Sequence, residues 1–178
     1  MVNWFEKGPE GEGRSGRHNG RPSVSEILPE LLIGEYPRDH DVQWLRDTYQ
    51  VTAVHNLQDD HDLSAHALDI RNLARIYAEY GITLVRTPIP DGSADAMREH
   101  LARALGDLHA LIDSRERVYL HCNGGVNRAP TLAIGYLRAH RGMSLDEAMA
   151  HVKKRRACGP FMTVLEDYFG PRDHKPGR

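Results

Sequence analysis

Short hydrophobic runs alternate with longer amphipathic stretches along this chain. Four of the runs have the length and the β-branched content of strands, and residues that favour turns bound them. Strands that alternate with helices indicate an α/β fold with a mostly parallel central sheet flanked by helices. The four predicted strands lie at residues 31–33, 51–57, 82–86 and 118–121.

The stretches between the strands repeat their hydrophobic residues every three or four positions, which is typical of amphipathic helices. Ser93 can cap a long helix whose apolar face runs from Met97 to Ile112. Ser144 and Glu147 form a capping box that starts another helix. The remaining predicted helices cover residues 39–49, one continuous stretch over 63–80, the segment that follows residue 128, and 164–169.

The length of 178 residues suits one domain, since domains typically hold about 100–200 residues. Residues 1–24 contain many polar residues and glycines but no apolar stretch, so we expect a disordered tail and no signal peptide. Ordered structure is predicted to begin near Ile27. We therefore predict a folded domain over 25–170 and a short tail over 171–178.

Charge and cysteine content narrow the class of protein. The net charge of -2 gives no reason to expect nucleic acid or an acidic membrane as partner. No apolar run approaches the roughly 20 residues of a membrane-spanning helix. The two cysteines, Cys122 and Cys158, suit a reducing cytoplasm better than a secreted disulfide scaffold. The histidines show no ligand-like spacing, so we predict a cytoplasmic protein without a metal site.

The segment from His121 to Arg128 carries the most distinctive chemistry of the chain. It follows a predicted buried strand, opens a predicted helix and contains two glycines. Backbone amides at a helix start bind anions, and glycines let a loop turn such amides inward. The same field favours the thiolate of Cys122, and Arg128 can grip two phosphate oxygens. A packing cysteine beside an ordinary turn is the alternative, but the register of all these features favours a nucleophilic anion site.

A cysteine, five residues and an arginine, with a histidine before the cysteine, resemble the signature of the protein tyrosine phosphatase superfamily. The compact size resembles its dual-specificity branch, which implies a dual-specificity phosphatase-like sandwich. The resemblance implies that Cys122 attacks phosphorus, that a cysteinyl-phosphate forms, and that no metal or organic cofactor takes part. His121 is expected to pack beneath the loop and hydrogen-bond it. The phosphate-binding residues implied are Asn123, Gly124, Gly125, Val126, Asn127 and Arg128.

The resemblance also implies a general acid on a mobile loop about thirty residues before the cysteine. Asp91 precedes Cys122 by 31 positions and lies in the proline-flanked loop 88–92. A turn aspartate is the plain alternative. Asp95 competes for the role, but it falls in a first helical turn, where the helix dipole accounts for it. We therefore expect Asp91 to act as general acid and then as general base.

From about residue 27 to residue 160 the chain is similar to the glucan phosphatases, the laforin and plant starch-phosphatase group. This similarity implies a phosphorylated glucan as preferred substrate. Asn127 replaces the usual glycine, and asparagine tolerates the left-handed backbone that such a loop can require. Gly124 replaces the usual alanine, and Ala129 lacks a hydroxyl that supports hydrolysis of the intermediate. The segments that carry the similarity are 56–62, 88–91, 128–130 and 154–160.

Several alternatives stay open. A dual-specificity phosphoprotein phosphatase would share every catalytic residue. A phosphoinositide phosphatase is disfavoured because residues 123–127 contain no cation. A non-catalytic phosphate-binding module is disfavoured because nucleophile, arginine and acid are all present. A rhodanese-type sulfurtransferase fits the closing arginine and the upstream acid less well.

Three further features have two interpretations each. A glucan would have to lie on the catalytic domain itself. Tyr36, Trp44 and Tyr49 are the candidates to contact it, and the alternative is that some of them belong to the core. The basic run 153–156 could attract phosphorylated polymers, but we favour a solvated helix end. Cys158 could form a regulatory disulfide with the nucleophile, but a packing role is the simpler expectation.

Overall fold

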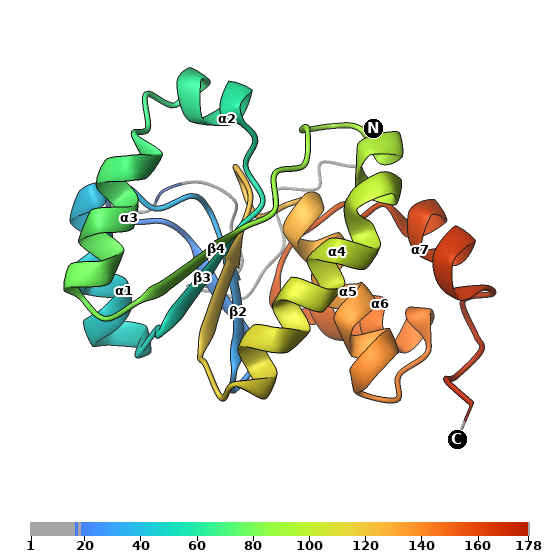
Figure 1. Cartoon of the computed structure of the whole chain (residues 1–178). Helices are drawn as coiled ribbons and strands as arrows, with labels where there is room; N and C mark the ends of the chain where they lie inside the picture. The colour runs from blue at the N-terminus through green and yellow to red at the C-terminus, as the bar shows by residue number, and fades with distance from the viewer. Residues whose placement is uncertain (1–16, 18, 178) are drawn as a thin grey trace.

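Five strands form the central sheet, in the order β1-β2-β5-β3-β4 (Figure 1). β2, β5, β3 and β4 run parallel, and β1 pairs antiparallel with β2 at one edge. The structure, a computed structural model, describes residue 17 and residues 19–177. Its sheet confirms the predicted α/β fold. The strands are β1 (Val24–Leu28), β2 (Leu31–Gly34), β3 (Ala53–Asn56), β4 (Thr83–Arg86) and β5 (Val118–His121).

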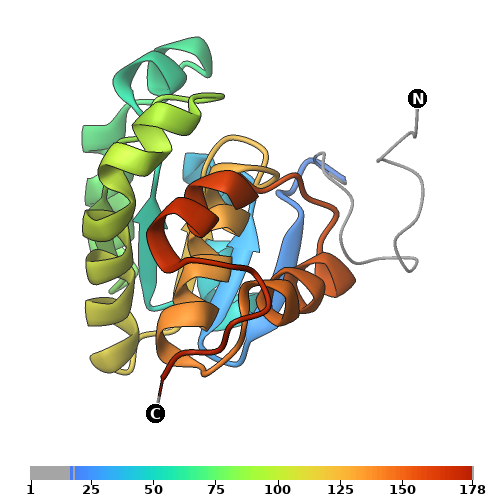
Figure 2. The ribbon, with the colours of Figure 1, turned by 90° about the vertical axis from the view of Figure 1, so that its right-hand side faces the viewer.

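Helices cover both faces of the sheet (Figures 1 and 2). One face carries α4 (Ala94–Asp113), α5 (Arg128–His140), α6 (Leu145–Arg155) and α7 (Met162–Phe169). The other face carries α1 (Val42–Tyr49) and α3 (Ile70–Glu79), preceded by the short 3-10 helix η1 (Asp39–Asp41). The short helix α2 (Asp60–Ala65) follows β3 and lies past the end of the sheet.

The three central strands, β2, β5 and β3, are buried on both faces, because successive residues of a strand point to opposite sides of the sheet and helices cover each side. Leu31 and Ile33 of β2 join the larger hydrophobic cluster, under α4 and α5, while Leu32 joins the smaller one, under α1 and α3. Val118 and Tyr119 of β5 divide in the same way. This burial on both faces explains why the central strands appear in the sequence as continuous hydrophobic runs and not as alternating hydrophobic and polar residues.

The parallel strands all end at one edge of the sheet, and the loops that follow them therefore meet there. These loops cover residues 35–38 after β2, 57–59 after β3, 87–93 after β4 and 122–127 after β5. In an open α/β sheet the crevice beyond the carboxyl ends of the strands is the usual ligand site. The order of the strands thus brings together segments that are far apart in the sequence.

Two sequence-based expectations are wrong. Ordered structure begins before Ile27, because β1 starts at Val24 and its polar positions concealed it. The single helix predicted over 63–80 is divided into α2 and α3. Ala67 adopts a left-handed conformation with φ 52°, which interrupts the helix, and Asp69 then caps α3 by accepting hydrogen bonds from two amides of its first turn.

The predicted tails are only partly described. Residues 1–16 and 18 lie outside the described residues, whereas Arg17 makes an ion pair with the buried Asp41 at 2.5 Å. Near the other end, the carbonyl of Arg172 accepts a hydrogen bond from the amide of Asp146. The domain boundaries at 25 and 170 stay a prediction. None of the described helices combines the length and apolar character needed to span a membrane.

Candidate active site

The loop between β5 and α5, together with the first residue of α5, forms what we call the signature loop (residues 122–128). Each of its first five carbonyl groups is bound from outside the loop. Cys122 O accepts from His121 Nδ1 at 3.0 Å, Asn123 O from Tyr36 N at 3.0 Å, Gly124 O from Arg156 Nη2 at 2.9 Å, Gly125 O from Arg156 Nε at 2.5 Å, and Val126 O from Gly159 N at 2.8 Å.

These outward carbonyls fix the direction of the amides. In a planar trans peptide the carbonyl and the following N–H point in opposite directions, so the amides of residues 123–127 turn to the inner side of the loop. None of these amides donates a hydrogen bond to another described residue. A group of convergent unpaired amides at a helix start is a nest for a tetrahedral oxyanion.

The two glycines of the loop differ in what they require. Gly125 has φ 63°, and a Cβ there would lie 2.5 Å from Gly34 O and 2.6 Å from Arg156 Nη2. A Cβ at Gly124 would meet only Val126 Cγ2, at 3.5 Å. The structure therefore demands glycine at position 125 and leaves room for alanine at position 124.

Asn127 does not use the left-handed backbone that asparagine tolerates, since its φ is -121°. Instead, its side chain Nδ2 donates to Gly159 O at 2.7 Å. Asparagine here ties the end of the signature loop to the segment after α6.

Arg128 is fully buried, and its guanidinium has one anchored end and one open edge. Nη1 donates to Asp62 Oδ2 at 2.6 Å and to Ile89 O at 2.7 Å. Nε and Nη2 have no hydrogen-bond partner among the described residues, although Nη2 lies 3.0 Å from Asp91 Oδ1. The open edge can bind two oxygens of one phosphate.

Asp62 is a site residue that the sequence analysis did not single out. It lies on α2, is 3 % exposed, and accepts from Arg128 and from Asn123 Nδ2, the latter at 2.7 Å. Burial alone would raise the pKa of this carboxyl, but the hydrogen bonds from Arg128 and Asn123 hold its pKa below the ordinary value. A signal was present, because three aspartates follow a buried strand at the carboxyl edge of the sheet, at positions 59, 60 and 62.

Asp91 reaches the signature loop from the loop after β4. Its Oδ2 accepts from Asn123 Nδ2 at 3.3 Å, and its side chain is 52 % exposed. The preceding Ile89 is pinned on both sides, since its amide donates to Leu57 O and its carbonyl accepts from Arg128. The structure thus brings Asp91 to the mouth of the site, as the sequence suggested.

Asp95, the competing acid, is placed elsewhere. It lies in the first turn of α4, almost fully exposed, and pairs with Arg98 at 2.7 Å. Its position matches the dipole-complementing role of an acidic residue at a helix start.

Asn123 and Gln58 complete a polar network at the mouth. Gln58 is buried and its Nε2 donates to Asn123 Oδ1 at 2.8 Å. Asn123 Nδ2 then donates to both Asp62 and Asp91. The side chain next to the cysteine therefore bridges the buried carboxylate and the exposed one.

His121 and the two cysteines are buried. His121 is 1 % exposed, and burial lowers its pKa to about 4, so that the neutral ring donates from Nδ1 to the carbonyl of Cys122. Both cysteines are free thiols. Burial raises the pKa of Cys158 to about 11, and this residue belongs to the larger hydrophobic cluster, in keeping with a packing role.

The basic run 153–156 is a solvated helix end only in part. Lys153 and Lys154 are exposed, but Arg156 is 1 % exposed, which corrects the interpretation for that residue. Its backbone leaves α6 in an extended conformation, with φ -147° and ψ 129°, and its side chain runs beneath the signature loop.

Of the three aromatic residues considered for a glucan, only Tyr36 lies beside the signature loop. Its ring stacks on His66 with centroids 4.3 Å apart, and Arg38 lies 5.6 Å from the ring centroid. Trp44 and Tyr49 pack against the smaller hydrophobic cluster. They belong to the core side of α1, as the alternative expectation held.

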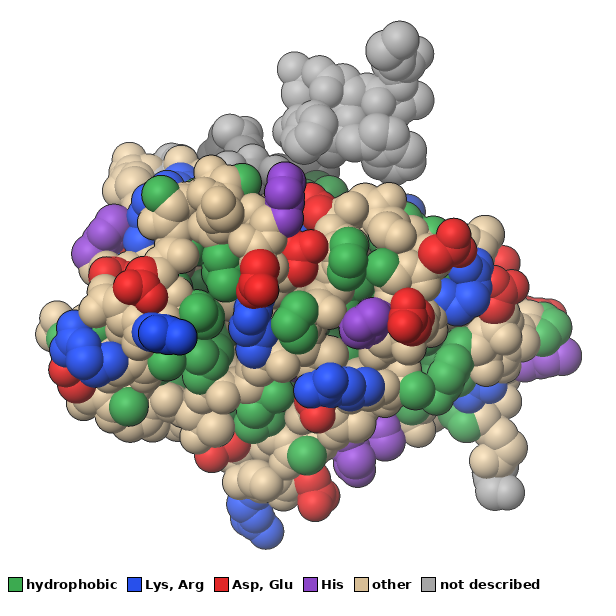
Figure 3. Space-filling view, turned by 45° about the horizontal axis from the view of Figure 1, so that its top comes forward, with side chains coloured by type: hydrophobic (Ala, Val, Ile, Leu, Met, Phe, Trp, Pro, Cys, Tyr) green, Lys and Arg blue, Asp and Glu red, His purple; other side chains and the backbone are tan. Residues whose placement is uncertain are grey.

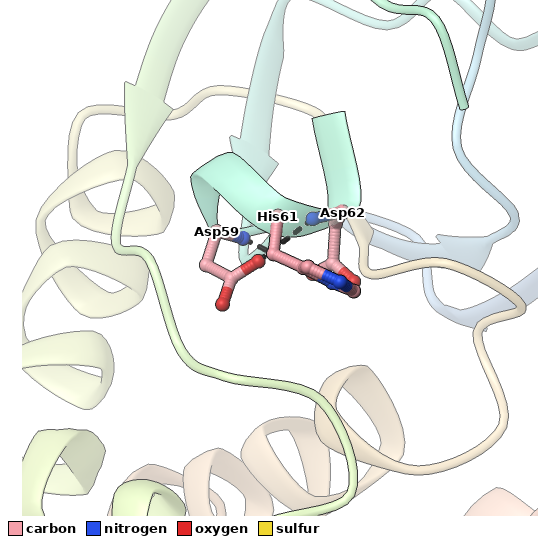
Figure 4. Close-up of side chains that lie close together, drawn as sticks. All are labelled: Asp59, His61 and Asp62. Atoms are coloured by element: carbon pink, nitrogen blue, oxygen red, sulfur yellow. Dashed lines mark hydrogen bonds between the residues drawn. The ribbon is translucent and has the colours of Figure 1, made fainter. Parts of the chain in front are cut away.

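Asp59, His61 and Asp62 bring one ligand atom each within 4.8 Å of one another on α2 (Figure 4). The two carboxylates already serve as a capping box, in which each accepts from the other residue's amide. Asp62 is also committed to Arg128. These hydrogen bonds account for the cluster, and we assign no metal to it.

The family comparisons agree with this geometry. A family model described as the catalytic domain of dual specificity phosphatases matches residues 32–165. Laforin of Mus musculus is 29 % identical over 154 residues, which cover 80 % of this chain and 46 % of laforin. The amyloplastic phosphoglucan phosphatase DSP4 of Castanea sativa is 28 % identical over 153 residues, or 84 % of this chain and 40 % of that protein. This chain thus spans less than half the length of either relative.

Two further comparisons concern the branch and the fold. Dual specificity protein phosphatase 22 of Xenopus tropicalis is 27 % identical over 154 residues, which cover 84 % of this chain and 66 % of that protein. The solved structure of Tk-PTP in its active form superposes with a TM-score of 0.69 and 24 % identity, over 81 % of this chain and 94 % of that one. The fold described above is therefore shared with that solved structure.

Proposed function

Because this chain belongs to the dual-specificity phosphatase family, we propose that it is a cysteine-dependent phosphatase whose preferred substrate is a phosphorylated glucan. The family match defines the enzyme class as a phosphoric monoester hydrolase. One observation carries the assignment of the site, namely the unpaired amides of residues 123–127, which lie in the loop between Cys122 and Arg128 with its open guanidinium edge.

In the proposed first step, the Cys122 thiolate attacks phosphorus in line while the bond to the leaving oxygen breaks. Asp91 gives its proton to that oxygen, and a cysteinyl-phosphate remains. In the second step Asp91, now a carboxylate, takes a proton from water, which attacks phosphorus and releases phosphate with the thiolate. The nest amides and Arg128 stabilise the three equatorial oxygens throughout. The proposed steps use no cofactor.

Phosphate binding and the placement of the acid are linked in this proposal. Asp91 Oδ1 lies 3.0 Å from Arg128 Nη2, which is on the edge that the phosphate would take. A bound phosphate dianion would therefore displace the carboxyl outward, toward the leaving oxygen. Asp91 is exposed enough to make this movement, whereas Asp62 stays on Nη1 and keeps the guanidinium aligned.

The substrate class rests on similarity and on the surroundings of the loop. Two relatives are laforin and an enzyme named a phosphoglucan phosphatase, and Tyr36 stands beside the loop, where a sugar ring would pass. A phosphoprotein substrate is the alternative, in line with the similarity to dual specificity protein phosphatase 22. On the face shown in Figure 3 basic, acidic and histidine side chains are interspersed, which does not favour a polyanionic lipid headgroup.

The substrate is tested by phosphate release from phosphorylated starch and glycogen, beside phosphotyrosine and phosphoserine peptides and an aryl phosphate. We expect strong release from the glucan relative to the aryl phosphate, and its loss in Cys122→Ser. Turnover of peptides and aryl phosphate without release from glucan would replace the glucan substrate by a phosphoprotein. No turnover of any of these compounds by a folded wild-type protein would contradict the phosphatase itself.

We further propose that one catalytic domain covers residues 25–170, between tails at 1–24 and 171–178. A cytoplasmic location is supported by the two free thiols, since secreted proteins of this size more often pair their cysteines.

A further inference from the structure

Arg156 lies beneath the signature loop and is 1 % exposed. A guanidinium carries five N–H donors, and five oxygen atoms accept from this one. They are Gly125 O, bound to Nε at 2.5 Å; Ser25 Oγ at 3.2 Å and Ile33 O at 3.4 Å, bound to Nη1; and Gly124 O at 2.9 Å and Ser23 Oγ at 3.0 Å, bound to Nη2. Full pairing of this kind offsets the cost of burying a charge.

Two of these acceptors are consecutive carbonyls of the loop, and their direction decides where the next amides point. By holding Gly124 O and Gly125 O outward, Arg156 directs the amides of Gly125 and Val126 into the nest. Glycine restricts φ and ψ less than any other residue. The two peptide groups that follow the glycines are therefore the ones that most readily turn over, and they are the ones that Arg156 holds.

We propose that Arg156 is a positioning residue of the phosphatase reaction. It fixes two of the nest amides and adds a buried positive charge behind the loop. The inference rests on the proposed phosphate site at Cys122, but it does not depend on the glucan substrate. The ionisable groups that face Arg156 are Glu35, Tyr119, Cys122 and Cys158.

Two substitutions separate the charge of Arg156 from its geometry. Arg156→Met removes both, while Arg156→Lys keeps the charge but offers its donors from a single nitrogen instead of a planar fork. Arg138→Met is the matched control, because Arg138 is also a largely buried arginine, yet it lies ten residues along α5 from Arg128, or about 15 Å. Each protein is first checked for cooperative thermal unfolding.

The first measurement is the affinity for inorganic phosphate, taken as competitive inhibition of aryl phosphate hydrolysis. The second is the pH profile of the alkylation of Cys122 by iodoacetamide. We expect phosphate affinity to fall by about tenfold or more in both Arg156 variants, since hydrogen bonds to a charged ligand are each worth about that much. We expect the alkylation profile to move up by about one pH unit in Arg156→Met and by less in Arg156→Lys. Arg138→Met should match the wild type in both.

The inference would be overturned by folded Arg156 variants whose phosphate affinity lies within twofold of the wild type and whose alkylation profile does not shift along the pH axis. If neither Arg156 variant folds, Ser25→Ala serves instead, because it removes one acceptor of Nη1 and leaves the charge in place. Phosphate affinity about threefold weaker in that variant supports the inference, and unchanged affinity overturns it. A wild-type protein that binds no phosphate would contradict the proposed function and not the role of Arg156 alone.

Discussion

Asp62 and Arg128 form a buried ion pair, with Asp62 Oδ2 2.6 Å from Arg128 Nη1 and both side chains almost inaccessible to solvent. The pair joins α2 to the start of α5 across the carboxyl edge of the sheet. It leaves the opposite edge of the guanidinium open toward the nest. Asp62 thus orients the group that is proposed to hold the phosphate.

Asp62→Asn should lower kcat/KM for an aryl phosphate by about a hundredfold, because a neutral amide aligns the guanidinium less firmly. Asp62→Ala should in addition destabilise the fold by about 3–5 kcal/mol, since it removes the buried carboxylate that pairs with the buried Arg128. Steady-state kinetics and chemical denaturation measure the two effects. Asp60→Asn is the control, because Asp60 is exposed and pairs with Arg86 outside the site. Equal kcat/KM values for Asp60→Asn and Asp62→Asn would contradict the role of Asp62 in orienting Arg128.

Asp91→Asn should slow the hydrolysis of alkyl phosphates by about a hundredfold or more and that of aryl phosphates much less. Good leaving groups need little protonation, so the loss of a general acid falls on the poor ones. The measurement is kcat for a series of phosphates with leaving groups of rising pKa. Asp95→Asn, a neighbouring change on α4, should leave the series unchanged. A uniform loss across the series would assign the acid role to another residue.

Gly125→Ala should abolish phosphatase activity, whereas Gly124→Ala should keep it within about threefold of the wild type. A Cβ at position 125 would collide with Gly34 O and Arg156 Nη2 in a left-handed backbone, while position 124 has room. The two variants change the loop by the same methyl group, so each controls for the other. Assays with an aryl phosphate decide the matter, and the reverse order of activities would contradict the described loop conformation.

Stability should fall as the pH drops from about 6.5 toward 4. Burial lowers the pKa of His55 and of His121 to about 4 in the folded protein, against 6.5 as the ordinary value. Between these values the unfolded chain binds more protons than the folded one, so stability is full above pH 6.5 and declines on acidification. Each histidine contributes on the order of 3 kcal/mol. Urea denaturation at several pH values measures the decline.

His55→Asn isolates one of these contributions. His55 Nε2 is 2.8 Å from Thr87 Oγ1, which donates to Asp107, so the hydrogen bond of the ring is made outside the signature loop. The variant should show a shallower loss of stability between pH 6.5 and 4, whereas His61→Asn, at an exposed position, should match the wild type. An identical slope in all three proteins would contradict the assignment to buried histidines.

The sequence predicted the sheet and the central part of the site because both depend on local patterns. Buried strands, a glycine-bearing turn and a helix start fall in one register around Cys122 and Arg128, and the loop with Asp91 precedes them at the expected separation. The break at Ala67 escaped prediction, because hydrophobic residues keep their helical spacing on both sides of it. Such spacing does not register a single left-handed residue.

Asp62 and Arg156 escaped prediction for a different reason. Each looks like an ordinary charged residue at a helix end, where solvation and the helix dipole provide a sufficient explanation. Their burial follows from tertiary contacts with segments 66 and 31 residues away along the chain, namely Arg128 and Gly125. The periodicity of one helix holds no information about contacts at such separations.

Ile89 anchors the base of the loop after β4, whose exposed tip carries Asp91. Its side chain is fully buried, and both of its backbone polar atoms are bound, to Leu57 and to Arg128. Only the tip from Pro90 to Gly92 is left to swing, on a stem that stays fixed to the sheet. Exposed loop tips of this size move within nanoseconds to microseconds, while hinged lids take microseconds to milliseconds. Movement of this loop would then not limit the entry of substrate or the exit of phosphate.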